Sequence, residues 1–385
     1  MREASRTQSS GQATPHGGFS KAFAFDTSDD GKGINIDIDS LDTEFLKTLS
    51  ITPNDQTSNP RWLALQLESP SSAELIKTYL NELHDQEFLS ICTRLAVGLC
   101  RRNVDLIRGR VLVQTSPSVA YDCQRTLDHA RLYASEFARA GIPKDRYCIK
   151  IMATGPGLNA ARILKDEGIA TLGTGVFSVA QAVACSQAGC LFISPYYNEI
   201  RTFIDTSLWP KVADPALDHP FSNRIAQIVD AYQVLFQKTG QPQPLIKNAG
   251  FQSYQEVIAS AELGCHSATV PLDLLEEMQK MKAGSLDLPE TKNVAKLQYP
   301  YSKEADIFPS RLRPLLSSDA CAQLEPGEKW LRTELHVDYL ANDGKLLKET
   351  LEKDKAATRM VDDALALFTH CENEIKKALS PQASL

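Results

Sequence analysis

The sequence predicts a single domain built as a closed parallel barrel of eight strands and eight helices. Short runs of β-branched and apolar residues alternate with longer segments of helical periodicity, and this alternation indicates a parallel sheet. Eight such units favour closure into a barrel over an open sheet. No GxGxxG motif follows the first strand, which disfavours an open dinucleotide-binding sheet.

The elements follow one another in a regular order. Strands are predicted over 33–38, 55–60, 109–115, 147–153, 169–176, 190–197, 244–251 and 267–275. The second strand is weak on propensity alone, and we accept it because the alternation requires it. Helical periodicity is strongest over 71–102, 126–141, 157–168 and 179–189. The last three of these segments end on a glycine, which is typical of a helix C-terminus.

The two ends of the chain differ from the barrel in composition. Residues 1–30 are rich in Ser, Gly, Thr and Gln, so we expect a disordered tail there and a single domain over 31–385. A proline-containing connector over about 286–314 leads to a charged helical segment over about 327–379. That segment either packs on the barrel or lies over its mouth, and the sequence leaves this choice open.

Composition excludes several classes of protein. The formal net charge is -7 and lysine and arginine are scattered among acids, so we expect no nucleic-acid partner. The nine cysteines include no CxxC pair, which argues against a disulfide framework and against a structural metal site. Neither a membrane-spanning run nor a signal peptide is visible, so we expect a cytoplasmic protein with no membrane partner.

Polar residues at the predicted ends of the strands are the natural candidates for a site, because active sites of parallel barrels form at the C-terminal ends of their strands. These candidates are Asp39, Asn59, Gln114, Lys150, Thr174, Ser194, Tyr196 and Asn248. Each residue alone has an ordinary structural explanation, such as helix capping by Asp39 or packing by Tyr196. It is the expected convergence of all eight residues on one barrel mouth that indicates an active site.

Lys150 is the least ordinary of these residues, because it lies within a strand that should be buried on both faces. Alternation places Cys148, Lys150 and Met152 on one face, which we expect to point into the barrel. Burial should lower the pKa of the ammonium and so favour the neutral amine that attacks a carbonyl. The alternative is a lysine that reaches solvent at a strand end.

Lys247 is the rival nucleophile. The strand parity that we assign places Lys247 outward together with Ala249 and Phe251, and Asn248, Gly250 and Gln252 inward. A β-bulge would invert this assignment, so Lys247 ranks below Lys150 without being excluded.

Four segments together resemble the transaldolase family. They are DQTSNPRWL from Asp55, GRVLVQT from Gly109, CIKIMATGPGLNAARILKDEGIA from Cys148 and FSVAQAVACSQAGCLFISPYYNEI from Phe177. The resemblance implies a parallel α/β barrel without a cofactor, which moves a dihydroxyacetone unit between sugar phosphates through a lysine Schiff base. Lys150 matches the Schiff-base lysine and Asp39 the acid of the first strand. Asn59, Thr174 and Ser194 match polar residues of the second, fifth and sixth strands.

The sequence also departs from the family pattern. Gln114 stands where the family has its general acid/base glutamate, and an amide does not titrate. Leu172 replaces an active-site asparagine, and Glu199 and Gln252 replace two phosphate-binding arginines. Tyr196 replaces a phenylalanine. Fructose-6-phosphate aldolases, which are small relatives of transaldolases, combine Gln and Tyr at the positions of Gln114 and Tyr196.

We therefore predict a transaldolase or transaldolase-like aldolase with Lys150 as nucleophile and a small carbonyl or sugar substrate. Asp39 would assist proton transfer, and Tyr196 with a water held by Gln114 would form the acid/base pair. Asn59, Ser194, Thr174 and Asn248 would bind substrate. One alternative is an aldolase or lyase for an unphosphorylated carbonyl compound. Another is an inactive barrel with a binding or regulatory role, and a homodimer remains open.

Overall fold

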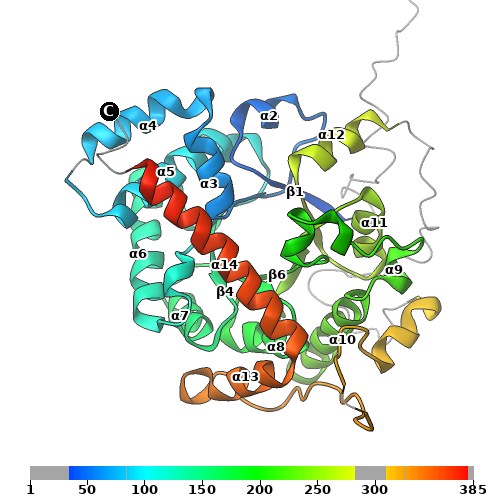
Figure 1. Cartoon of the computed structure of the whole chain (residues 1–385). Coiled ribbons are helices and arrows are strands. Elements are labelled where there is room, and N and C mark those ends of the chain that lie inside the picture. Colours follow the sequence, from blue (N-terminus) through cyan, green and yellow to red (C-terminus); the bar gives the residue numbers. More distant parts are fainter. Residues whose placement is uncertain (1–33, 84, 282–308, 325, 380–385) are drawn as a thin grey trace, which may run out of the picture.

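The computed structural model describes residues 34–83, 85–281, 309–324 and 326–379, and it contains the predicted closed barrel. All eight strands are parallel, and each pairs with its neighbours in chain order (Figure 1). The first strand closes the circle through pairing of Asn35 with Ser267 on the last. The strands are β1 (Asn35–Asp39), β2 (Gln56–Thr57), β3 (Val111–Gln114), β4 (Tyr147–Met152), β5 (Thr171–Val176), β6 (Phe192–Pro195), β7 (Leu245–Asn248) and β8 (Ser267–Val270).

Helices surround the barrel as expected. They are α2 (Thr43–Thr48), α3 (Pro60–Leu67), α4 (Ala73–Glu82), α5 (Phe88–Asn103), α6 (Cys123–Arg139), α7 (Gly155–Asp166), α8 (Val179–Ala188), α9 (Pro215–Asp218), α10 (Ser222–Thr239), α11 (Tyr254–Glu262), α12 (Leu272–Lys280), α13 (Ala341–Lys353) and α14 (Lys355–Ala378). The tail over 1–30 and most of the connector over 286–314 lie outside the described residues.

Three element predictions need correction. The long helical run over 71–102 is two helices, α4 and α5. The last strand ends at Val270, because Pro271 caps α12. The C-terminal segment becomes helical only at Ala341: within 326–340 the extended chain is held against α8 by Gln187, which bonds the backbone of Val337 and Tyr339. Backbone groups satisfied by a side chain do not need a helix.

The interior of the barrel is layered. An apolar layer of Leu112, Cys148, Leu172 and Phe192 fills its middle. Beside this layer, on the side of β1, β2 and β7, the ammonium of Lys247 lies among carboxylates and over the ring of Phe192. Toward the C-terminal ends the inward residues turn polar. Because strand side chains alternate between faces, Leu112 and Cys148 direct Gln114 and Lys150 into that polar layer.

Helix α14 settles the choice that the sequence left open. It packs against α3 and against the short 3-10 helices η3 (Pro117–Val119) and η5 (Ile200–Phe203). Figure 1 shows it running across the barrel, in front of β4 and β6. Its residues Leu367 and Phe368 line the main pocket. The C-terminal segment therefore covers part of the barrel mouth.

Candidate active site

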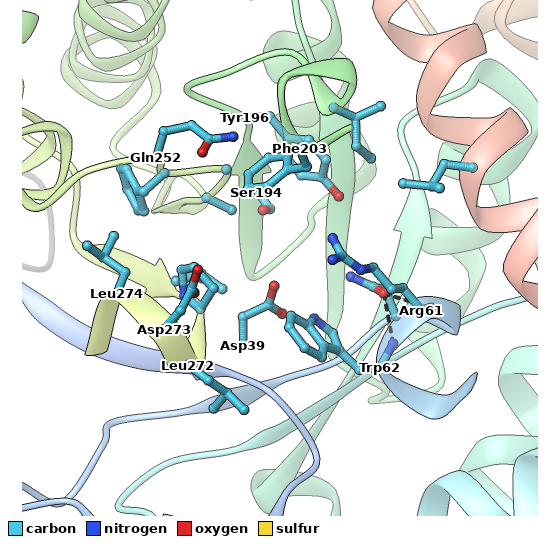
Figure 2. Close-up of a pocket in the computed structure, with 18 of the residues that line it drawn as sticks. Asp39, Arg61, Trp62, Ser194, Tyr196, Phe203, Gln252, Leu272, Asp273 and Leu274 are labelled. Carbon is cyan, nitrogen blue, oxygen red and sulfur yellow. Dashed lines mark hydrogen bonds between the residues drawn. The ribbon is translucent and has the colours of Figure 1, made fainter. Parts of the chain in front are cut away.

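A pocket of about 400 Å³ opens at the C-terminal ends of the strands. Its polar floor and walls include Asp39, Asn59, Lys150, Ser194 and Tyr196, which the sequence placed together. Figure 2 shows the Asp39 carboxylate directed into the cavity, with Ser194 and Tyr196 across from it. Five of the eight predicted site residues therefore meet in one cavity.

Lys150 lies at the base of this pocket and is 4% exposed. Its Nζ forms no hydrogen bond or ion pair with another of the described residues. Burial lowers the pKa of the Lys150 ammonium below its ordinary value, and the nearby carboxylate of Asp39 opposes this shift. The apolar layer that includes Cys148 and Leu172 lies beneath it and explains the loss of solvation. The arrangement favours a neutral amine that faces an open cavity.

The environment of Lys247 is the opposite, and our parity assignment for β7 is wrong. Lys247 points into the barrel, where its Nζ lies 2.8 Å from Asp37 Oδ2 and 2.6 Å from Asp55 Oδ2. These carboxylates raise the pKa of the Lys247 ammonium although burial opposes them. The Nζ also lies 4.5 Å from the centre of the Phe192 ring. A charged lysine closed in this way is a poor nucleophile.

The cause of the wrong parity lies after the strand. Gly250 has a φ of +78°, a conformation that breaks the alternation of an extended chain. Gln252 does line the pocket, but it does not share a face with Asn248. The amide of Asn248 instead donates to Ser260 Oγ of α11, outside the barrel. Asn248 is therefore not among the described residues that line the pocket, and its role in substrate binding stays a prediction.

Tyr196 and Thr174 form a pair in the upper layer. Their hydroxyl oxygens lie 3.3 Å apart, and burial raises the pKa of the Tyr196 phenol, an effect that the hydrogen bond to Thr174 partly offsets. The phenol therefore stays protonated and can donate a proton or a hydrogen bond. Asp39 Oδ1 accepts a hydrogen bond of 2.7 Å from Thr57 Oγ1, which fixes its carboxylate.

Gln114 is adjacent to Lys150 in the strand register but is not among the residues that line the main pocket. Both its amide nitrogen and its amide oxygen are buried without a hydrogen-bond partner. An unpaired buried polar group costs about 1–3 kcal/mol. An amide in this position is suited to hold a water molecule.

Asn59 has two tasks. Its Oδ1 caps α3 by accepting from the backbone nitrogens of Arg61 and Trp62 at 2.9 and 3.4 Å, and its side chain also borders the pocket. Arg61 and Trp62 line the pocket beside it, with the guanidinium 5.6 Å from the Trp62 ring (Figure 2). The helix that Asn59 begins thus delivers a cation and an aromatic ring to the mouth.

Neither Glu199 nor Gln252, at which we expected the family's phosphate-binding arginines to be replaced, offers a positive charge. Glu199 accepts two hydrogen bonds of 2.7 Å from Arg359 of α14 and another from Arg201. These bonds lower the pKa of Glu199. Gln252 donates to Thr202 Oγ1 at 3.0 Å. Among the described residues of the pocket, Asp39, Asp273 and Glu277 are acidic, and Arg61 and Lys150 are basic.

Sequence reasoning missed several residues of the site. Asp273 and Glu277 arrive on α12, which we had assigned partly to a strand, and Leu367 and Phe368 arrive on α14. The sequence predicted a charged helical segment here, but it did not predict where that segment docks. No group of three or more His, Cys, Asp or Glu suited to a metal ion occurs among the described residues. In the same part of the chain no helix has the length and apolarity needed to cross a membrane.

The fold and this pocket define a (β/α)8 barrel with a buried, unpaired lysine at the base of its mouth. Residues 36–310 match the family model described as Transaldolase/Fructose-6-phosphate aldolase. The chain belongs to that family.

Curated relatives agree. The chain is 30% identical over 329 residues to a transaldolase of Xanthomonas campestris pv. campestris, which covers 83% of this chain and 94% of the relative. It is 30% identical over 260 residues to a transaldolase of Synechocystis, covering 65% and 63% of the two chains. A transaldolase of Gloeobacter violaceus is 29% identical over 241 residues, or 60% of each chain.

Proposed function

We propose that this protein is a transaldolase-type class I aldolase that binds the carbonyl carbon of a ketose covalently through Lys150. The observation that carries the proposal is the amine itself: it is buried, unpaired among the described residues, lowered in pKa, and open to a pocket of about 400 Å³. This cavity is large enough for a small sugar. Lys247 has none of these properties except burial.

The reaction follows from the residues in the pocket. Lys150 Nζ adds to the carbonyl carbon, and loss of water leaves an iminium ion. Departure of the proton from the substrate's C4 hydroxyl lets the C3–C4 bond break, and its electron pair moves into the enamine. Asp39, Ser194 and Tyr196 surround this point. Addition of the enamine to an acceptor aldehyde reverses these steps, whereas protonation and hydrolysis release a free ketone.

A second candidate substrate class is an unphosphorylated carbonyl compound. Arginine binds phosphate through charge-assisted hydrogen bonds worth about 1.5–3 kcal/mol each. Gln252 supplies no charge, and Glu199 is an acid that is already paired with Arg359 and Arg201. Asp273 and Glu277 add further negative charge to the pocket. Arg61 is the one guanidinium among its described lining residues, so a phosphate would have a single strong anchor.

Trapping with borohydride tests the covalent step. The protein is incubated with dihydroxyacetone or fructose 6-phosphate and reduced, and its peptides are weighed by mass spectrometry. We expect the added mass on the peptide that contains Lys150, and none in Lys150→Met. Label on Lys247 would overturn the assignment. No label with either ketone or with unphosphorylated ketoses would favour an inactive barrel.

A further inference from the structure

A second cavity adjoins the main pocket at Asn59 and has a carboxyl group among its lining residues. Its volume is about 30 Å³, which is enough for about one or two water molecules. Asn59 borders both this cavity and the main pocket. The smaller cavity is therefore the space that adjoins the site of chemistry on the side of α3, α5 and α14.

Gln114 forms one wall of this cavity. The residue is only 5% exposed. Its side-chain nitrogen and oxygen are buried and have no hydrogen-bond partner among the described residues. Buried water characteristically binds groups of this kind. A water in the cavity would satisfy the amide and would link it to the other polar groups of the lining.

Among the described residues that line this cavity, Glu372 of α14 is the one with a carboxyl group. It is 8% exposed, and its Oε2 accepts a hydrogen bond from Ser118 Oγ of η3. The helix α14 thus places an acid behind the residue that occupies the position of the family's strand glutamate.

The other titratable groups near Glu372 are neutral at neutral pH. Burial raises the pKa of the Cys92 thiol of α5 to about 12 and also raises the pKa of the Tyr133 phenol of α6. Burial lowers the pKa of His129 of α6 to about 4. His129 Nδ1 accepts from the backbone of Ser116, so its hydrogen is on Nε2, near Thr93 Oγ1.

Charged groups of the neighbouring elements lie on α3, α5, α6 and α14, and Arg94 of α5 is paired with Glu136 of α6. Arg61 of α3 borders the main pocket rather than the small cavity, and Lys376 of α14 lies 5.9 Å from the ring of Phe88 on α5. Among the described residues that line the cavity, Glu372 therefore supplies a carboxyl group beside side chains that are uncharged at neutral pH.

We propose that Glu372 takes and returns the substrate proton through water held by Gln114, in place of the glutamate that transaldolases carry on the third strand. This inference rests on the proposed Schiff-base function. It accounts for three facts together: the loss of a titrating group at Gln114, the unpaired amide, and a buried carboxyl group behind it. In this arrangement the acid lies on the C-terminal helix α14 instead of on strand β3, and a water molecule connects it to Gln114.

The proton balance can be written for a simple ketone. In the iminium formed from dihydroxyacetone and Lys150, a C–H bond next to the iminium carbon breaks. Its electron pair forms the enamine double bond and neutralises the nitrogen, and the proton passes through water to the carboxylate of Glu372. The reverse step in heavy water returns a deuteron to carbon. Exchange of hydrogen for deuterium in dihydroxyacetone therefore measures this transfer directly.

The experiment compares exchange by nuclear magnetic resonance in the wild type and in Glu372→Gln, with borohydride trapping on Lys150 as a parallel readout. We expect Glu372→Gln to keep trapping, to slow exchange by roughly 10²-fold or more, and to lose the fall in rate that the wild type shows on the acid side. The matched control is Glu374→Gln, an exposed acid two residues along the same helix, which should exchange like the wild type.

Two further variants separate proton transfer from a structural role. Ser118→Ala removes the hydrogen bond to Glu372 and leaves the carboxyl group, so it should keep the acid limb of the pH profile. The double variant Gln114→Glu/Glu372→Gln returns a carboxyl group to the strand and should recover at least a tenfold part of the lost exchange rate. If Glu372→Gln is too unstable to assay, Glu372→Asp is used, which should keep exchange with a shifted acid limb.

The outcomes are distinguishable. Absence of trapping on Lys150 in the wild type contradicts the proposed function. Trapping with equal exchange in the wild type and Glu372→Gln overturns the relay and leaves the function standing. Equal losses in Ser118→Ala and Glu372→Gln, or no recovery in the double variant, would also overturn it by showing that Glu372 only supports the fold. Trapping without any exchange in the wild type would likewise contradict proton return through Glu372.

Discussion

Lys247 Nζ and Asp37 Oδ2 lie 2.8 Å apart inside the barrel, and Asp55 Oδ2 completes the cluster at 2.6 Å from the same Nζ. All three residues are buried. A buried ion pair is costly to assemble and still more costly to break, because the remaining charge has no solvent. The cluster therefore specifies how β1, β2 and β7 meet inside the barrel, beside the apolar layer.

This cluster predicts a pH dependence of stability. Burial raises the pKa of Asp37 to about 6, although Lys247 opposes the shift. Between about pH 4 and 6 the unfolded chain has released this proton and the folded chain retains it, so the contribution of Asp37 to the free energy of unfolding falls as pH rises. At about 1.36 kcal/mol per pKa unit the fall is at most about 3 kcal/mol.

Urea denaturation of the wild type and Asp37→Asn across this window measures the effect. We expect the difference between their unfolding free energies to shift in favour of Asp37→Asn as pH rises from 4 to 6. Asp37→Asn keeps Asp55 as a partner for Lys247 and so should fold. A difference that is constant with pH would contradict the raised pKa.

Tyr196→Phe removes one hydroxyl and preserves nearly all the volume. If the phenol passes the proton, turnover should fall by roughly 10²–10⁴-fold while borohydride trapping on Lys150 persists. Because burial raises the pKa of this phenol, we expect it to act in its protonated form. Steady-state turnover with trapping in parallel is the measurement. Unchanged turnover would show that the Tyr196 side chain only fills space. Asp39 would then be the proton-transfer residue in the main pocket.

Gln114→Glu restores the family's acid in an otherwise unchanged chain. We consider first the case in which Gln114 and Tyr196 work with an acid on α14. The glutamate introduced at position 114 then adds a carboxylate beside Lys150, and this negative charge raises the pKa of the amine. Turnover should therefore fall. The pH profile of Schiff-base formation should then shift to higher pH. A gain in turnover would instead show that the glutamine is a weakened form of the parental site.

Gln252→Arg tests phosphate recognition. Gln252 lines the pocket and has one neutral hydrogen bond, to Thr202, so a guanidinium there should improve KM for fructose 6-phosphate by roughly ten- to a hundredfold. KM for an unphosphorylated ketose should stay nearly constant. Gln252→Leu is the control, since it removes the amide without adding charge. Micromolar KM for fructose 6-phosphate in the wild type would contradict the premise.

Position 199 is a poor choice for the same experiment. Glu199 binds Arg359 and Arg201, so an arginine there would bring three guanidinium groups together and release α14. We expect Glu199→Arg to lose stability rather than gain phosphate affinity. Comparison of the thermal unfolding of Glu199→Arg with that of Gln252→Arg would show whether the substitution at position 199 lowers stability.

The sequence predicted the barrel because each strand is a short apolar run between helices, and Lys150 because its strand is regular from Tyr147 to Met152. Parity counting succeeds where the backbone stays extended. It failed at β7, where Gly250 turns the chain between Asn248 and Gln252. Glu372 and Phe368 could not be placed in advance, since their contacts depend on where α14 docks, more than 250 residues from Gln114 in the chain.

The helix that crosses the mouth also sets when the pocket is completed during synthesis. Asp39 is made early and Phe368 late, yet both border the same pocket. A ribosome must release the chain beyond Phe368 before this wall can form. A half-made barrel would leave Lys150 without this cover, so the growing chain acquires the finished pocket only in the last steps of its production.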